Sequence, residues 1–227
     1  YTPAADAQVT RVSTTNQLGW TSSVAYEPAF AVVLNAIDEN NKRTNLAYDP
    51  SGRLTSVWLP GRATTLTPNM SYTYQLRNHA PTVVTTKRLN PAGNQVTTYA
   101  LYDSLLRPRQ QQYPSPVTAG GRVVTDTFYD TAGRPFKTYN PYYNSAAPAT
   151  TLFAPTNASL VPSQGMSLFD GAGRTVANLF TPAGGELWRT SIGYGGDRID
   201  TTPPTGGTVT SQIFDAQGRM TKLRQYH

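Results

Sequence analysis

Apolar and polar residues alternate along the chain in short runs, which are separated by breaks rich in glycine, proline and asparagine. After Gly52 the residues at 54, 56 and 58 fall on one face of an extended strand and those at 55, 57 and 59 on the other, and residues 220–225 alternate in the same way. No long stretch repeats apolar residues at helical spacing. Because both faces of these runs are mixed, a thick sandwich core is disfavoured. The pattern predicts an all-β fold of antiparallel hairpin repeats in a broad curved sheet, with one face packed in patches.

A six-residue motif recurs along the chain: an aromatic residue, Asp, two variable residues, Gly and Arg. The composition would give about 0.005 complete copies by chance. The four complete copies are Tyr48-Asp49-Pro50-Ser51-Gly52-Arg53, Tyr129-Asp130-Thr131-Ala132-Gly133-Arg134, Phe169-Asp170-Gly171-Ala172-Gly173-Arg174 and Phe214-Asp215-Ala216-Gln217-Gly218-Arg219. A fifth, Tyr102-Asp103-Ser104-Leu105-Leu106-Arg107, lacks only the glycine. Tandem recurrence of this kind specifies an architecture rather than an activity.

Weaker copies and other turn signals lie between these motifs. Ile37-Asp38-Glu39-Asn40-Asn41-Lys42 and Leu89-Asn90-Pro91-Ala92-Gly93-Asn94 keep related residues at the key positions. The full copies are unevenly spaced, so some turns must lack the motif, and glycine pairs such as Gly195-Gly196 are candidates. We expect residues 1–227 to form one continuous repeat region, in which the Ala-, Pro- and Thr-rich residues 144–162 form a crossover loop.

Each residue type in the motif suits the tip of a hairpin. An Asp at the first position of a four-residue turn accepts hydrogen bonds from backbone amides further along, and a Gly at the fourth position tolerates a positive φ, which gives a type I turn with a bulge. The aromatic residue ends the incoming strand. The Arg begins the outgoing strand, and its guanidinium can reach back to the Asp carboxylate. An exposed pair of this kind contributes at most about 1 kcal/mol, so the turn geometry matters more.

Composition and charge narrow the class of protein. Hydrophobic residues make up 38% of the 227 residues and charged residues 14%, which is typical of a folded chain and leaves no apolar run for a membrane span. With no cysteine, neither a disulfide nor a thiolate metal site can form, and no metal or cofactor is expected. The net charge of +6 comes from singly scattered Arg and Lys residues, so we expect no nucleic-acid partner.

The aromatic-Asp-x-x-Gly-Arg motif in irregular tandem resembles that of the RHS, or YD-repeat, proteins. Segments such as Trp188-Arg189-Thr190 and Tyr194-Gly195-Gly196-Asp197-Arg198 are similar to those of large secreted RHS proteins of actinobacteria. In toxin complexes, polymorphic toxins and teneurins, the resemblance implies a β-sheet ribbon that spirals into a hollow shell. In the bacterial cases the shell encloses a toxic C-terminal polypeptide. The resemblance therefore implies a secreted or cell-surface parent protein, with flanking repeats and an enclosed toxin as the partners of this segment.

Several residues invite other interpretations, which we weighed against a structural role. Two of the motif aspartates at a suitable separation could act as a glycosidase pair, but each has a role in its own turn, so we predict no catalytic residues and no enzyme activity. Trp58 and Trp188 could stack on sugar rings, whereas packing across strands is the commoner use of aromatic residues in a sheet.

The expected function is a structural one: a segment of the wall of a hollow β-sheet shell that encloses a toxin or effector. The alternative is a carbohydrate-binding or cell-surface-binding module that presents its aromatic residues outward. Because some motifs lie 40 to 45 residues apart, a β-propeller is the architectural alternative. A shell segment, unlike a propeller, would expose long strand edges and could self-associate through them.

Overall fold

The computed structural model describes residues 8–226, so residues 1–7 and 227, at the ends of the expected repeat region, lie outside it. The described residues divide into two units, residues 8–77 with 82–99 and residues 78–81 with 100–226, and each is described by itself. Apart from two single-turn helices, η1 (Ala158–Leu160) and η2 (Pro182–Gly184), the regular elements are β-strands. Across residues 8–226, no helix is both long and apolar enough to cross a membrane.

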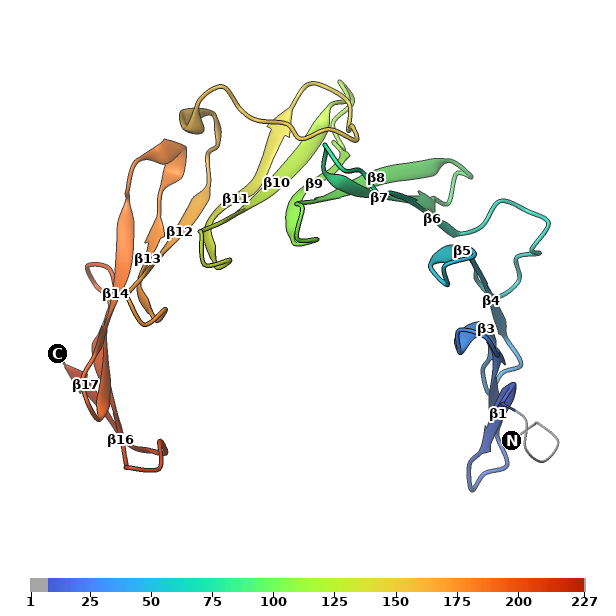
Figure 1. Cartoon of the computed structure of the whole chain (residues 1–227), viewed down its shortest axis with the longest axis horizontal. Coiled ribbons are helices and arrows are strands. Elements are labelled where there is room, and N and C mark those ends of the chain that lie inside the picture. Colours follow the sequence, from blue (N-terminus) through green and yellow to red (C-terminus); the bar gives the residue numbers. More distant parts are fainter. Residues whose placement is uncertain (1–7, 227) are drawn as a thin grey trace. The chain divides into compact units, whose positions relative to one another are not determined.

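In the first unit, successive strands pair antiparallel with their neighbours in chain order (Figure 1). The paired strands are β1 (Arg11–Thr15), β2 (Thr21–Glu27), β3 (Val32–Ile37), β4 (Arg43–Tyr48), β5 (Leu54–Trp58), β6 (Met70–Gln75) and β7 (Thr82–Leu89). A turn in which the Asn90 amide donates to the Asn94 carbonyl leads from β7 into β8 (Gln95–Tyr102). The boundary between the two units falls within β8.

The second unit continues the same plan. Its strands are β9 (Pro108–Pro114), β10 (Arg122–Tyr129), β11 (Pro135–Asn144), β12 (Gln164–Phe169), β13 (Thr175–Phe180), β14 (Trp188–Tyr194), β15 (Arg198–Thr202), β16 (Val209–Phe214) and β17 (Met220–Tyr226). Each pairs antiparallel with the next along the chain. Valine, threonine and aromatic residues are frequent in strands such as β10, because their branched or flat side chains suit a pleated sheet.

The prediction of an all-β fold built from antiparallel hairpins is confirmed. Unbroken consecutive pairing over seven strands in the first unit and nine in the second differs from the separate four-stranded blades of a propeller, so the architectural alternative is wrong. In such a sheet the turns alternate between the two ends of the strands. The turns after β2 and β4 therefore lie on one side of the first unit, while those after β3 and β7 lie on the opposite side.

The main buried cluster lies in the second unit, on one face of β10 and β11. Val124, Tyr139, Tyr142 and Val161 are buried there, and Phe153 packs against them from the long connection between β11 and β12. This connection, residues 145–163, is called the strap below. It covers the packed patch of the sheet, and Figure 1 shows it between β11 and β12.

Candidate functional site

The four complete motifs and the fifth copy form hairpin tips with one repeated geometry. At the first tip, the Gly52 amide donates to the Asp49 carbonyl at 2.9 Å, and the amides of Ser51 and Arg53 donate to Asp49 Oδ1 at 2.9 and 3.0 Å. Arg53 Nε donates to the other carboxylate oxygen, Oδ2, at 2.7 Å. The same Arg-to-Asp contact recurs in the pairs Arg107–Asp103, Arg134–Asp130, Arg174–Asp170 and Arg219–Asp215, at 2.7–2.8 Å.

A bulge accompanies each complete motif. The strand register shifts at the aromatic residue, so that Tyr48 lies opposite Leu54 and not opposite Thr55, which an unshifted register would require. Equivalent shifts occur at Tyr129, Phe169 and Phe214. Gly52, Gly133, Gly173 and Gly218 have φ values between +74° and +83°, and Leu106 adopts +57° in the copy without glycine. A leucine in this left-handed region carries backbone strain, since its Cβ crowds the following carbonyl.

The carboxylates at the tips are held in their ionised form. At Asp49, Asp130, Asp170 and Asp215 the hydrogen bond from the backbone amide of the motif Arg is the main cause that lowers the pKa of the carboxyl. The Arg side chain lowers it further. A general acid requires a raised pKa, so the tips do not have the electrostatics of the acid in a glycosidase pair.

Four of these five tips also contact the next hairpin along the sheet. The guanidinium of Arg107 lies 4.1 Å from the centre of the Tyr129 ring, and that of Arg134 lies 4.3 Å from the centre of the Phe169 ring. Arg53 over Tyr74 and Arg174 over Tyr194, at 4.9 and 4.4 Å, repeat the arrangement. These are cation–π contacts, and we call the series the arginine–aromatic ladder.

Tyrosine hydroxyls reinforce the ladder. The Tyr129 hydroxyl donates to the carbonyl of Pro108, the residue directly after Arg107, at 2.9 Å. Tyr74 and Tyr194 donate to Leu54 and Thr175, which directly follow Arg53 and Arg174. At these three steps the tyrosine of one hairpin thus contacts both the arginine side chain and the backbone at the tip of the hairpin before it.

The motif glycines have a second role that turn chemistry alone does not reveal. A Cβ built on Gly133 would lie 3.2 Å from Arg107 Nη1, and one on Gly173 would lie 3.2 Å from Arg134 Nη1. At Gly52 the ring of Phe30 takes this place, 3.1 Å from the added atom. Glycine therefore leaves room for the side chain of the preceding tip, besides tolerating a positive φ.

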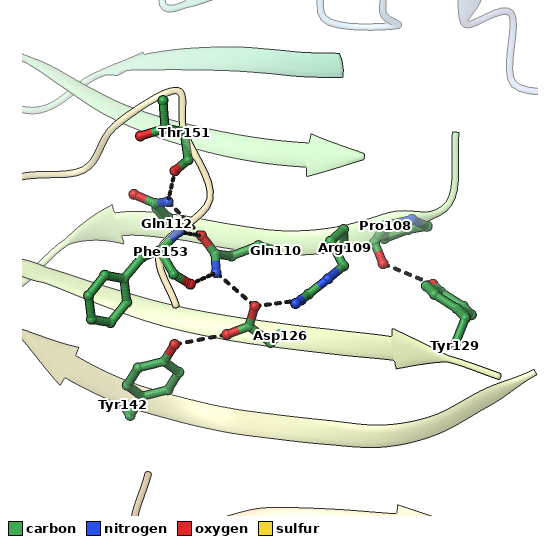
Figure 2. Close-up of polar contacts among 9 residues, drawn as sticks. All are labelled: Pro108, Arg109, Gln110, Gln112, Asp126, Tyr129, Tyr142, Thr151 and Phe153. Carbon is green, nitrogen blue, oxygen red and sulfur yellow. Dashed lines mark hydrogen bonds and ion pairs between the residues drawn. The ribbon is translucent and has the colours of Figure 1, made fainter. Parts of the chain in front are cut away.

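A buried polar network lies under the strap, and the sequence analysis missed it (Figure 2). The Asp126 carboxylate, on β10 and 4% exposed, accepts hydrogen bonds from Arg109 Nη1 at 2.6 Å, from Gln110 Nε2 at 2.7 Å and from the Tyr142 hydroxyl at 2.8 Å. Burial, followed by the charge of Asp126, raises the pKa of Tyr142, which keeps its hydroxyl protonated as a donor. The carboxylate is thus paired on both oxygens.

Two glutamines on β9 connect this network to the strap backbone. Gln110 accepts from the Phe153 amide at 2.9 Å and donates to the Phe153 carbonyl at 2.7 Å. Gln112 accepts from the Ala149 amide and donates to the Thr151 carbonyl, at 2.9 and 2.8 Å. Both side chains pair with extended backbone as a neighbouring strand would, so the strap is attached to the face of the sheet and not to its edge (Figure 2).

The remaining candidate residues have individual placements. Tyr48 donates to the Val33 carbonyl at 2.8 Å, and Tyr102 ends β8 in a half-buried position. Trp58 donates from its indole nitrogen to the Leu66 carbonyl at 2.8 Å, while Trp188 stacks on Phe180 with ring centres 5.4 Å apart and stays 44% exposed. Among residues 8–226, no three His, Cys, Asp or Glu side chains gather into a group that could hold a metal ion.

Known proteins resemble this chain in fold but not in sequence. No protein family model and no curated protein matches the chain. Among solved structures, the chain is similar to the Photorhabdus luminescens Tc holotoxin pore with a mutant TccC3, at a TM-score of 0.76 and 13% identity over 95% of this chain. It is also similar to a complex of TcdB2, TccC3 and Cdc42, at a TM-score of 0.70 and 12% identity over 95% of this chain. The chain spans 16% of the length of each of these solved chains.

Proposed function

We propose that this chain is a structural repeat segment of a secreted RHS, or YD-repeat, protein and forms part of the wall of a hollow β-sheet shell around a C-terminal toxin or effector. The observation that carries the proposal is the arginine–aromatic ladder, in which the motif arginines of four tips each contact an aromatic ring of the next hairpin. The likeness of fold to chains of Tc toxin complexes, over 95% of this chain, supports the same role. The partners would be the flanking repeats and the enclosed polypeptide.

The chemistry of the tips supports a non-catalytic role. Each motif Asp is occupied on one oxygen by turn amides and on the other by its Arg, as Asp49 is by Arg53. These contacts and the lowered pKa keep the carboxyl ionised and unsuited to protonate a leaving group, so we propose that the segment stabilises a wall and does not act as an enzyme.

Protection of the enclosed polypeptide tests the proposal on the parent protein. The full-length parent is treated with a broad-specificity protease, and the survival of its C-terminal polypeptide is followed over time; the same polypeptide produced alone is the control. We expect the enclosed form to survive for at least ten times longer. Equal rates of digestion in the two samples would contradict enclosure.

Glycan binding is the second candidate, and the exposed stack of Trp188 on Phe180 is the feature that favours it. Trp58 is the matched comparison, because its indole nitrogen is already used within the chain. Binding to a glycan array that is lost in Trp188→Ala and kept in Trp58→Ala would favour this candidate. An array without binding would remove it.

A further inference from the structure

Within the described part of the second unit, the arginine–aromatic ladder that begins at Arg107 stops before Phe214. At the other hairpins of the second unit that carry a motif aromatic after a tip arginine, the guanidinium covers the next ring, as Arg107 covers Tyr129 and Arg134 covers Phe169. Tyr194, under Arg174, ends β14, and Phe214 is the aromatic residue at the next tip on the same side; within the described residues no cation lies over the Phe214 ring. The face of the Phe214 ring, which corresponds to the ring face covered by an arginine at the other steps, is therefore not covered by a guanidinium of the described residues.

The turn between β14 and β15 explains the interruption. Here the Gly195 amide donates to the Arg198 carbonyl at 2.8 Å, which closes a turn shorter than the Asp-x-x-Gly tip. Arg198 consequently lies two residues before Asp200 on the same face of β15, and its Nε donates to Asp200 Oδ2 at 2.9 Å. The arginine that could have covered Phe214 is thus paired within its own strand.

An open cleft lies where the guanidinium would be. It has a volume of about 600 Å³ and is lined by the shortened turn, residues 194–199, and by Phe214, Asp215, Ala216 and Gly218 of the next tip. A Cβ on Gly218 would meet no atom within 4 Å, whereas the equivalent glycines, Gly133 and Gly173, lie against an arginine. The cleft thus has the three features of a ladder step that holds an arginine: a motif glycine, Gly218; an aromatic ring, Phe214; and room for a guanidinium.

The charges at the cleft suit a cation. Asp197, the carboxylate of the preceding turn, lines the cleft, and within residues 8–226 its side chain has no hydrogen-bonding or ion-pair partner. Arg198 also lines the cleft, but its charge is balanced by Asp200. Asp215 contributes a second carboxylate, which shares its Oδ2 with Arg219 at 2.8 Å.

We propose that this cleft binds an arginine side chain presented by a partner polypeptide, with the guanidinium stacked on Phe214 and paired with Asp197. The occupied steps of the same sheet supply the chemistry of the ligand, since each holds a guanidinium between an aromatic ring and a carboxylate of the preceding turn. The proposal is independent of the shell function, because it depends on this cleft alone.

Titration of the isotope-labelled 227-residue chain with N-acetyl-arginine amide, followed by NMR, tests the proposal. We expect saturable shifts of the amides of residues 194–199 and 214–218. N-acetyl-citrulline amide, which has the same shape without the charge, should bind at least about fivefold more weakly, and Phe214→Leu should weaken arginine binding by about two- to fivefold, the range of an exposed cation–π contact. Asp197→Asn should weaken it as well, and this variant keeps the ring and lies in an exposed turn.

Trp20→Leu is the matched control, because it removes an exposed aromatic residue of the first unit and should leave the titration unchanged. Equal responses to the arginine and citrulline probes, or unchanged affinity in both Phe214→Leu and Asp197→Asn, would overturn the proposal. Equal binding of N-acetyl-lysine amide would overturn the assignment to a guanidinium, because a site that selects charge alone would not need the ring-sized cleft.

Discussion

Replacing Asp126 by alanine should destabilise the second unit more than any exposed substitution in the sheet. The change removes the acceptor for three donors, from Arg109, Gln110 and Tyr142, at 2.6–2.8 Å. Hydrogen bonds to a charged partner contribute about 1.5–3 kcal/mol each, but they are not additive within one network. The Arg109 side chain is 23% exposed and can turn partly to water. We therefore expect a loss of about 3–4 kcal/mol in the free energy of unfolding, within the range for breaking a buried ion pair.

Equilibrium unfolding in urea, followed by tryptophan fluorescence, measures this loss. With a slope of about 1–3 kcal/mol per molar, the midpoint should fall by at least about 1 M. Asp126→Asn keeps the size of the side chain and an acceptor for Tyr142, so it should lie between the wild type and Asp126→Ala. Glu186→Ala, which removes an exposed ion pair with Arg189, is the control and should shift the midpoint much less.

The comparison of the two alanine variants decides the question. If Asp126→Ala and Glu186→Ala shifted the midpoint equally, the buried network would contribute no more than a surface pair, and the reasoning would be refuted. A full loss in Asp126→Asn would assign the effect to the charge, whereas a loss confined to Asp126→Ala would assign it to the cavity and the missing acceptors.

The remaining predictions concern the tips and the exposed tryptophan. Gly173→Ala should cost roughly 1–2 kcal/mol in urea unfolding, because an L-residue is strained at φ +82°, while Gly171→Ala, where an added Cβ meets open space, should be close to neutral. Leu106→Gly relieves strain at φ +57° and should raise the unfolding free energy by up to about 1 kcal/mol; a loss would count against strain at this tip. The pKa of Asp49 is lowered in the folded state, so the stability of the wild type over Asp49→Asn should persist above about pH 4 and disappear as the pH falls, in unfolding measured between pH 2 and 7. If the glycan candidate is right, a sugar should quench the tryptophan fluorescence of the wild type, and Trp188→Ala should reduce this quenching. If it is wrong, titration with the sugar should leave the fluorescence of both proteins unchanged.

The sequence reveals the hairpin tips because their contacts are local. The bonds of Asp49 to Ser51 and Arg53 span four residues at most, so residue type and spacing suffice to predict the turn. The alternation of residues between the two faces of a strand is also a local pattern. It predicts strands after Gly52 and before Tyr226, where β5 and β17 lie. Local rules are the part of the fold that a single sequence carries most directly.

The sequence does not reveal contacts between distant segments. Phe153 meets Gln110 across 43 residues, and nothing in the run Gln110-Gln111-Gln112 specifies the backbone that it binds. The one available signal was Asp126, a charged residue in a run of valine, threonine and phenylalanine, where burial of an acid requires partners. The sequence also does not reveal at which end of the strands a turn lies. Asn90 resembles a motif Asp, but it lies in the turn after β7, at the strand ends opposite to those of the turn after β4.

Within each unit the full motifs lie at the same ends of the strands, and this restricts how the number of strands can change. Adding or deleting one strand would send every later tip of that unit to the opposite ends of the strands and would separate the last arginine before the change from the ring that it covers. Adding or deleting two strands keeps the order of tips intact. Such a chain can therefore grow or shrink by whole hairpins, and the strap, an insertion between two paired strands, shows a second way to add residues without disturbing the parity of the sheet.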